Sequence, residues 1–230
     1  MNGEELREAR LRKDWTQQQT AARLGVTQAY LSMLERGHRV LPGALAREAV
    51  DVLEASPTTL PLRTESLDMA HGSDKVRREL AGLGYPGFAH VRGVRRNPAE
   101  VLFRALNEAD LDTRVAEGLP WLAHRYADMD WEWLVQSAKL RDRQNRLGFV
   151  TALALQLATK SSESELQGFR KLKEYLAVLE RSRLVREDTF CHDSLTETER
   201  KWLRRNRPAE AEHWNLLTDL KAENLPYAAS

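Results

Sequence analysis

Residues 16–37, TQQQTAARLGVTQAYLSMLERG, decide the fold of the N-terminal part of the chain, because they have the pattern of two short helices joined by a glycine turn. Thr16 and Thr27 each precede a helical segment, where a threonine hydroxyl can accept from the free N–H groups of the first turn. Gly25 lies between the segments and readily adopts the positive φ that ends a helix. The apolar positions expected to face one another are Ala21, Leu24, Leu31 and Leu34. The stretch therefore predicts a packed pair of helices.

The second helix of this pair leaves small and polar side chains pointing away from the first, namely Gln28, Ala29, Ser32 and Met33. A helix pair with a glycine turn and a polar outer face is typical of the helix-turn-helix arrangement, which places its second helix in the major groove of DNA. The amide of Gln28 carries a donor and an acceptor that match N6 and N7 of adenine. We therefore predict that this helix binds double-stranded DNA, with Gln28 as the main base contact.

The run T-Q-x-x-x-A-x-x-L-G-V-T-x-x-Y-L-S-x-L-E-R-G resembles the helix-turn-helix family of the lambdoid phage repressors and Cro, with the bacterial regulators and antitoxins similar to them. The resemblance covers residues 4–55 and implies a five-helix domain. It also implies that Arg10 pairs inside the fold with Glu35, a buried pair whose disruption costs ~3–5 kcal/mol. Thr20 stands where the family usually has leucine or valine, so we expect slightly looser helix packing there.

The same resemblance implies how this surface contacts DNA. A glutamine at the position of Gln17 bonds a phosphate and braces the recognition helix, and the loop that carries Arg36 and Arg39 meets phosphate. Thr27 caps its helix and also reaches a phosphate, and residues 27–34 enter the major groove. The remaining outward side chains contact the DNA backbone or thymine methyl groups. The complete predicted set is Gln17, Thr27, Gln28, Ala29, Tyr30, Ser32, Met33, Arg36 and Arg39.

Composition limits the other function classes. The 230 residues carry a net charge of +1, with 42% hydrophobic and 30% charged residues, which suits a folded chain of one or two domains. Basic and acidic residues balance within residues 1–55, so DNA affinity must come from the placement of charges. The single cysteine, Cys191, excludes an intrachain disulfide and a cysteine-based zinc site. With no leader and no apolar run long enough for a bilayer, we expect a cytoplasmic protein without membrane contact, cofactor or metal.

The chain divides by its pattern into three parts. Residues 1–56 form the helix-turn-helix domain, and Pro57 and Pro61 mark its end because two prolines break the helix. Residues 57–97 form a linker with a short helix and the basic segment 90–96, which either touches DNA phosphates or forms a solvated loop. Residues 98–230 form a larger helical bundle, and the predicted fold class is therefore all-α.

Helical periodicity dominates this third part, and no strand is expected in it. The apolar stripe of the helix at 163–183 indicates either a core face or a short coiled coil. The basic runs 139–146 and 200–207 indicate solvated faces, or sites for an acidic partner or flanking DNA. The expected helices begin at Pro98, cover 112–126, run from Asp130 to as far as Leu157, cover 163–183, follow a capping box of Thr196 and Glu199, and run from Pro208 to Leu220.

Two features of the third part raise other chemistries. Trp131 and Trp133 are about 200° apart on a helix, so both cannot face one core, and one faces another helix of the bundle or another chain. A stacking platform for single-stranded nucleic acid is a weaker interpretation. Cys191-His192-Asp193 invites a metal or nucleophile interpretation, but adjacent residues diverge and no companion motif follows. We predict no catalytic residue.

These observations favour a sequence-specific transcriptional regulator, a dimeric repressor that binds an inverted repeat with half-sites ~34 Å apart. We expect the homodimer contact in residues 98–230, because one small helix-turn-helix unit buries little surface on DNA. The alternative is an antitoxin or defence-system regulator, whose C-terminal domain binds a partner protein, a toxin or defence component, while its N-terminal domain controls its own operon. A regulator that senses a small effector is a third hypothesis, and an enzyme is the weakest.

Overall fold

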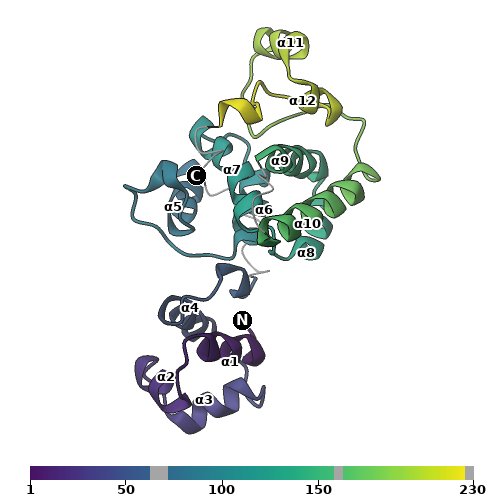
Figure 1. Ribbon diagram of the computed structural model, residues 1–230. Helices are drawn as coiled ribbons and strands as arrows, with labels where there is room; N and C mark the ends of the chain where they lie inside the picture. The colour runs from purple at the N-terminus through teal and green to yellow at the C-terminus, as the bar shows by residue number, and fades with distance from the viewer. Residues whose placement is uncertain (63–71, 158–162, 226–230) are drawn as a thin grey trace. The chain divides into compact units, whose positions relative to one another are not determined.

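In the computed structural model, which describes residues 1–62, 72–157 and 163–225, the chain divides into two compact units. Unit 1 comprises residues 1–63 and 95–97, and unit 2 comprises residues 64–94 and 98–230. Both are built mainly from helices (Figure 1), so the predicted helical fold with a larger C-terminal part is confirmed. None of the helices in the described ranges has the length and apolarity needed to cross a membrane.

Unit 1 packs four α-helices and one 3-10 turn around an apolar core that includes the fully buried Leu6 and Ala46. The fifth helical element of the predicted domain is this single turn, which Pro57 opens. Gly3 lets the first helix approach the third, because a Cβ there would lie 2.1 Å from the carbonyl oxygen of Leu34. The elements are α1 (Gly3–Arg12), α2 (Gln17–Arg23), α3 (Gln28–Glu35), α4 (Gly43–Val52) and η1 (Pro57–Thr59).

Two residues from the end of the predicted linker, the connector at 57–97, complete unit 1. The buried Asn97 donates from Nδ2 to the backbone oxygens of Thr58 and Leu60, at 3.0 and 2.6 Å. Arg95, within the basic segment, donates from Nη1 to Oδ1 of Asp51 on α4 at 2.6 Å. The end of the connector therefore belongs to the same compact unit as the helix-turn-helix.

Unit 2 is built around α9, which is buried over most of its length, as a helix surrounded by others must be. Gly148 on α9 receives the ring of Trp214, since a Cβ there would lie 2.3 Å from the ring. The stripe on α10 contributes Leu172 and Leu179 to the core of this unit. The elements are α5 (Gly72–Gly82), η2 (Pro86–Phe88), α6 (Pro98–Asn107), α7 (Thr113–Arg125), α8 (Trp131–Lys139), α9 (Gln144–Leu157), α10 (Glu163–Glu180), β1 (Asp188–Thr189), α11 (Glu197–Asn206), α12 (Ala209–His213), β2 (Leu216–Leu217) and η3 (Ala222–Asn224).

The expected continuation of one helix from Asp130 to Leu157 is wrong, because the chain turns between α8 and α9. Asp142 has a φ of 55°, a left-handed conformation that a continuous α-helix excludes. The N–H of Arg143 bonds the carbonyl oxygen of Ala138 at 2.8 Å and closes the turn. The two resulting helices can therefore pack against different neighbours.

The last expected helix is also shorter than predicted. Pro208 precedes it as the cap, but α12 ends at His213, and Asn215 then takes a φ of 53°. The chain leaves this turn as β2, which pairs in parallel with β1. The sequence did not predict this strand pair, because two residues are too few to show an alternating pattern.

The basic run that ends at Arg146 is only partly a solvated face, because Arg146 is fully buried. Its guanidinium donates to both carboxylate oxygens of Asp188, at 2.8 and 3.0 Å, and to Oδ1 of Asp193 at 3.1 Å. It also donates to the backbone oxygens of Leu106 and Glu108, at 3.1 Å each. Arg146 therefore joins α9 to the end of α6 and to β1.

The two neighbouring tryptophans of α8 face different helices of unit 2. Trp131 is buried and stacks on Tyr175 of α10, with ring centroids 5.5 Å apart. Trp133 is half-buried and packs edge-on against Phe103 of α6, also at 5.5 Å. Both side chains therefore find partners within the bundle.

Candidate nucleic-acid interface

The helix-turn-helix is held by the local signals that the sequence predicts. The hydroxyl of Thr16 accepts from the N–H of Gln19, whose side chain accepts in return from the N–H of Thr16, which makes a capping box. Thr27 caps α3 by accepting from the N–H of Tyr30 at 3.2 Å. Gly25 has a φ of 62° between the two helices. The turn residues thus set the angle at which α3 leaves α2.

A chain of hydrogen bonds runs from the core of unit 1 to the surface of α3. Arg10 donates to both oxygens of Glu35, at 2.6 and 3.0 Å, which is the pair that the resemblance implied. Glu35 also accepts from Nε2 of Gln17 at 2.8 Å. The amide oxygen of Gln17 then accepts from Nε2 of Gln28 at 2.9 Å. A buried ion pair therefore orients Gln17, and Gln17 orients Gln28.

This arrangement leaves Gln28 able to recognise a base. A glutamine amide has two N–H donors and one acceptor oxygen, and Gln17 uses only one donor. Gln28 forms no other side-chain hydrogen bond within the described residues, and it is exposed. One donor and one acceptor remain free, which is the pair required for N7 and N6 of adenine.

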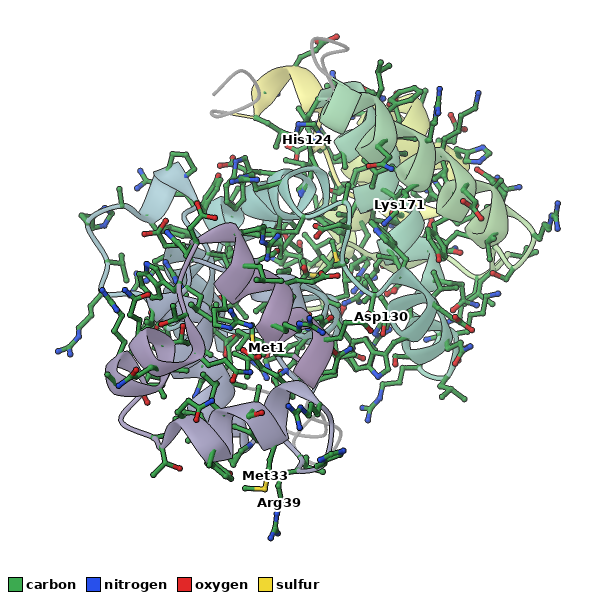
Figure 2. All side chains as sticks on the ribbon, turned by 60° about the horizontal axis from the view of Figure 1, so that its bottom comes forward. Met1, Met33, Arg39, His124, Asp130 and Lys171 are labelled. Atoms are coloured by element: carbon green, nitrogen blue, oxygen red, sulfur yellow. The ribbon has the colours of Figure 1, made fainter. Side chains whose placement is uncertain are left out.

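The basic residues that follow α3 include two of the predicted phosphate contacts, Arg36 and Arg39. Arg36, His38 and Arg39 are exposed, and none of them forms an ion pair within the described ranges. Figure 2 shows the side chains of Met33 and Arg39 projecting on the same side of unit 1. Met33 is 37% exposed, so it presents an apolar contact beside these cations.

The remaining predicted contact residues differ in solvent exposure. Thr27 and Ala29 are exposed, whereas Gln17, Tyr30 and Ser32 are half-buried. The hydroxyl of Thr27 already accepts a bond inside α3 but retains its own donor for a phosphate. The nine predicted residues therefore differ in accessibility.

Two residues that the sequence analysis did not predict as DNA contacts, Thr16 and Gln18, lie at this surface. An open hollow between the starts of α2 and α3 is lined by Thr16, Gln17, Gln18 and Gln28. Gln18 is exposed and directly follows Gln17, and its place in the first turn after the Thr16 cap was the available signal. The hydroxyl and amides of this hollow are neutral hydrogen-bonding groups of the kind that contact phosphate oxygens in protein–DNA complexes.

The Cys191-His192-Asp193 run lies in unit 2 and offers no activated thiol. Cys191 is buried, and burial raises the pKa of its thiol to about 11, although the charge of Arg146 opposes this shift. The thiol is therefore neutral at physiological pH, whereas a nucleophile or metal ligand needs the thiolate. Within the described ranges, no three His, Cys, Asp or Glu side chains are grouped as a metal site.

Comparison with known proteins identifies only the first part of the chain. Residues 6–60 match a family model described as Helix-turn-helix, and the remainder matches no family model. No curated protein matches the chain. No solved structure matches it either. The matched segment runs from within α1 to η1 and includes α2 and α3, which carry Gln17 and Gln28. The match suggests a DNA-binding regulator.

Proposed function

We propose that this chain is a sequence-specific transcriptional regulator that inserts residues 27–34 into the major groove of DNA. The observation that carries the proposal is the orientation of Gln28 by Gln17, which leaves one donor and one acceptor exposed. A side chain held in its binding conformation loses less conformational entropy on binding. Arg36 and Arg39 supply charge for phosphate contacts, so base reading and positioning come from the same side of unit 1.

We further propose that the protein acts as a dimeric repressor on an inverted repeat. Residues 1–55, which contain the helix-turn-helix, have no excess of positive charge, so this segment binds weakly as a single copy. Two copies joined through unit 2 place two recognition helices on half-sites ~34 Å apart. The partner-protein alternative has less support from the tryptophans of unit 2, because Trp121, Trp131 and Trp214 are buried and only Trp202 is exposed.

Selection of bound DNA from a random pool with the full chain tests the first proposal. We expect an inverted repeat with an adenine at a fixed position in each half-site. Gln28→Ala should reduce discrimination at that adenine by about 1–3 kcal/mol and leave the other positions unchanged. Gln136→Ala, a change in an exposed glutamine of unit 2, is the matched control.

Two results would contradict the base-reading role of Gln28. Gln28→Ala could leave the selected DNA sequence unchanged, or it could weaken base preference to the same extent at every position of the site. Sedimentation of the full chain tests dimerisation, and a reporter driven from the selected site tests repression. If the protein sediments as a monomer at concentrations that saturate the inverted repeat, the dimer is wrong. If reporter activity rises as the protein is expressed, repression is wrong.

A further inference from the structure

Unit 2 contains a cavity of about 330 Å³ between α11, the start of α7 and the segments that follow β1 and β2. This volume falls at the lower end of small-molecule sites in proteins. The walls are mainly apolar, and they include Leu111, Ala116, Phe190, Leu203, Leu217 and Leu220. The cavity therefore suits a ligand with a compact apolar body.

The cover of this cavity, α11, is thinly packed. Leu203 is its only buried residue, and Figure 1 shows α11 at the outer edge of unit 2. Polar contacts hold the helix, since Arg204 forms hydrogen bonds with both carboxylate oxygens of Glu187 and Arg200 bonds the backbone oxygen of Asp193 at 3.0 Å. None of these four residues lines the cavity, so the contacts leave its apolar interior available.

Trp202 provides an independent sign that this wall is made for a ligand. Its indole lines the cavity, yet Trp202 is 54% exposed, and it is the only exposed tryptophan, tyrosine or phenylalanine in the described part of the chain. Tryptophan is usually well buried because its ring removes a large apolar area from water. A ligand in the cavity would cover this ring.

Among the Asp, Glu, Lys and Arg side chains of the described residues, only acidic ones line the cavity. Glu199 and Asp219 line it, whereas no lysine or arginine does. One oxygen of Glu199 accepts two bonds from Thr196, at 2.7 and 2.6 Å, while its other oxygen has no hydrogen-bond partner in the described ranges. The bonds from Thr196 lower the pKa of Glu199, so this carboxylate is charged at neutral pH. His192 also lines the cavity and interacts with Glu199.

We propose that the cavity beneath α11 binds a small organic cation with an apolar, ring-containing body. The body packs on the leucine and phenylalanine walls, and Trp202 covers it from the rim. The cationic group lies near Glu199 and Asp219, where opposite charge and the indole face both favour it. This site is separate from the surface proposed for DNA, and its test needs no DNA, so either proposal can fail alone.

Three matched probes test the proposal on the full chain: 4-phenylbutylamine, 4-phenylbutan-1-ol and 4-phenylbutyrate, which differ in charge at one end. Calorimetric titration at neutral pH should show saturable binding of the amine to one site. We expect the carboxylate to bind at least about tenfold more weakly than the amine, with the alcohol in between. Equal affinities for amine and carboxylate, or no binding of the amine, would overturn the proposal.

Variants locate the site. Glu199→Gln keeps a side chain that can accept from Thr196, so α11 remains capped. This variant should bind the amine about fivefold more weakly, with little change in the affinity for the alcohol. Trp202→Ala should weaken the binding of the amine and of the alcohol to the same extent. Glu197→Gln is the control, because Glu197 is an exposed acid in the same turn of α11 that does not line the cavity. If Glu197→Gln weakens binding of the amine as much as Glu199→Gln does, general attraction to the negative charge of α11 explains the binding. The proposed site would then be wrong.

Discussion

The hydroxyl of Thr20 gives a sharp test of how unit 1 is packed. Thr20 on α2 is fully buried, and its Oγ1 has no hydrogen-bond partner within the described residues. An unsatisfied buried polar group costs about 1–3 kcal/mol. Thr20→Val keeps the branched shape and nearly the same helix propensity while replacing the hydroxyl by a methyl group. We therefore expect the free energy of unfolding of unit 1 to rise by about 1–2 kcal/mol.

Thr27→Val makes the same chemical change where the hydroxyl is used. Thr27 is exposed and caps α3 by accepting from the N–H of Tyr30. Loss of such a cap costs about 1 kcal/mol. The two substitutions should therefore change the free energy of unfolding in opposite directions. Because threonine and valine are both β-branched, β-branching alone predicts no change for either.

Amide hydrogen exchange of the full chain measures this, because it reports each unit separately. The N–H groups of Leu31 and Leu34 in the core of unit 1 should exchange about tenfold more slowly in Thr20→Val and several-fold faster in Thr27→Val. The N–H of Leu147 in unit 2 should not change in either variant. Faster exchange at the N–H groups of Leu31 and Leu34 in Thr20→Val would refute the conclusion that the buried hydroxyl destabilises unit 1.

Two further outcomes concern unit 2. Burial by itself would raise the pKa of Asp188, but the hydrogen bonds and charge of Arg146 outweigh it and hold that pKa below its ordinary value. The stabilisation from this pair is therefore complete above the ordinary aspartate pKa and is lost as pH falls through the lowered value. The Asp188→Asn variant should have a lower free energy of unfolding at pH 7, and that free energy should depend less on pH. Urea unfolding from pH 7 to pH 2 measures this, and an unchanged pH profile would contradict the role of the pair. Iodoacetamide at pH 8 should label Cys191 only when unit 2 opens, because the thiol is buried with a pKa of about 11; labelling of the native chain at the rate of a denatured control would show that the thiol is accessible.

Much of unit 1 could be predicted from sequence because its determinants are local. The caps at Thr16 and Thr27 and the positive φ at Gly25 depend on residues within one turn. The match of residues 6–60 to the helix-turn-helix model includes this stretch. The outward position of Gln28 also follows from periodicity alone. Its remaining hydrogen-bonding capacity does not, since that depends on where the amide of Gln17 lies.

The sequence by itself thus determined the helix pair, its capping, its glycine turn and the side that faces outward. Only the tertiary structure decided that Asn97 returns to unit 1, that Arg146 is buried, and that α11 covers a cavity. The reason is sequence separation: Arg146 meets Asp188 across 42 residues, and Asn97 meets Thr58 across 39. A basic side chain is solvated or buried according to the partners that the folded chain brings to it, and no local pattern around Arg146 encodes partners that far away.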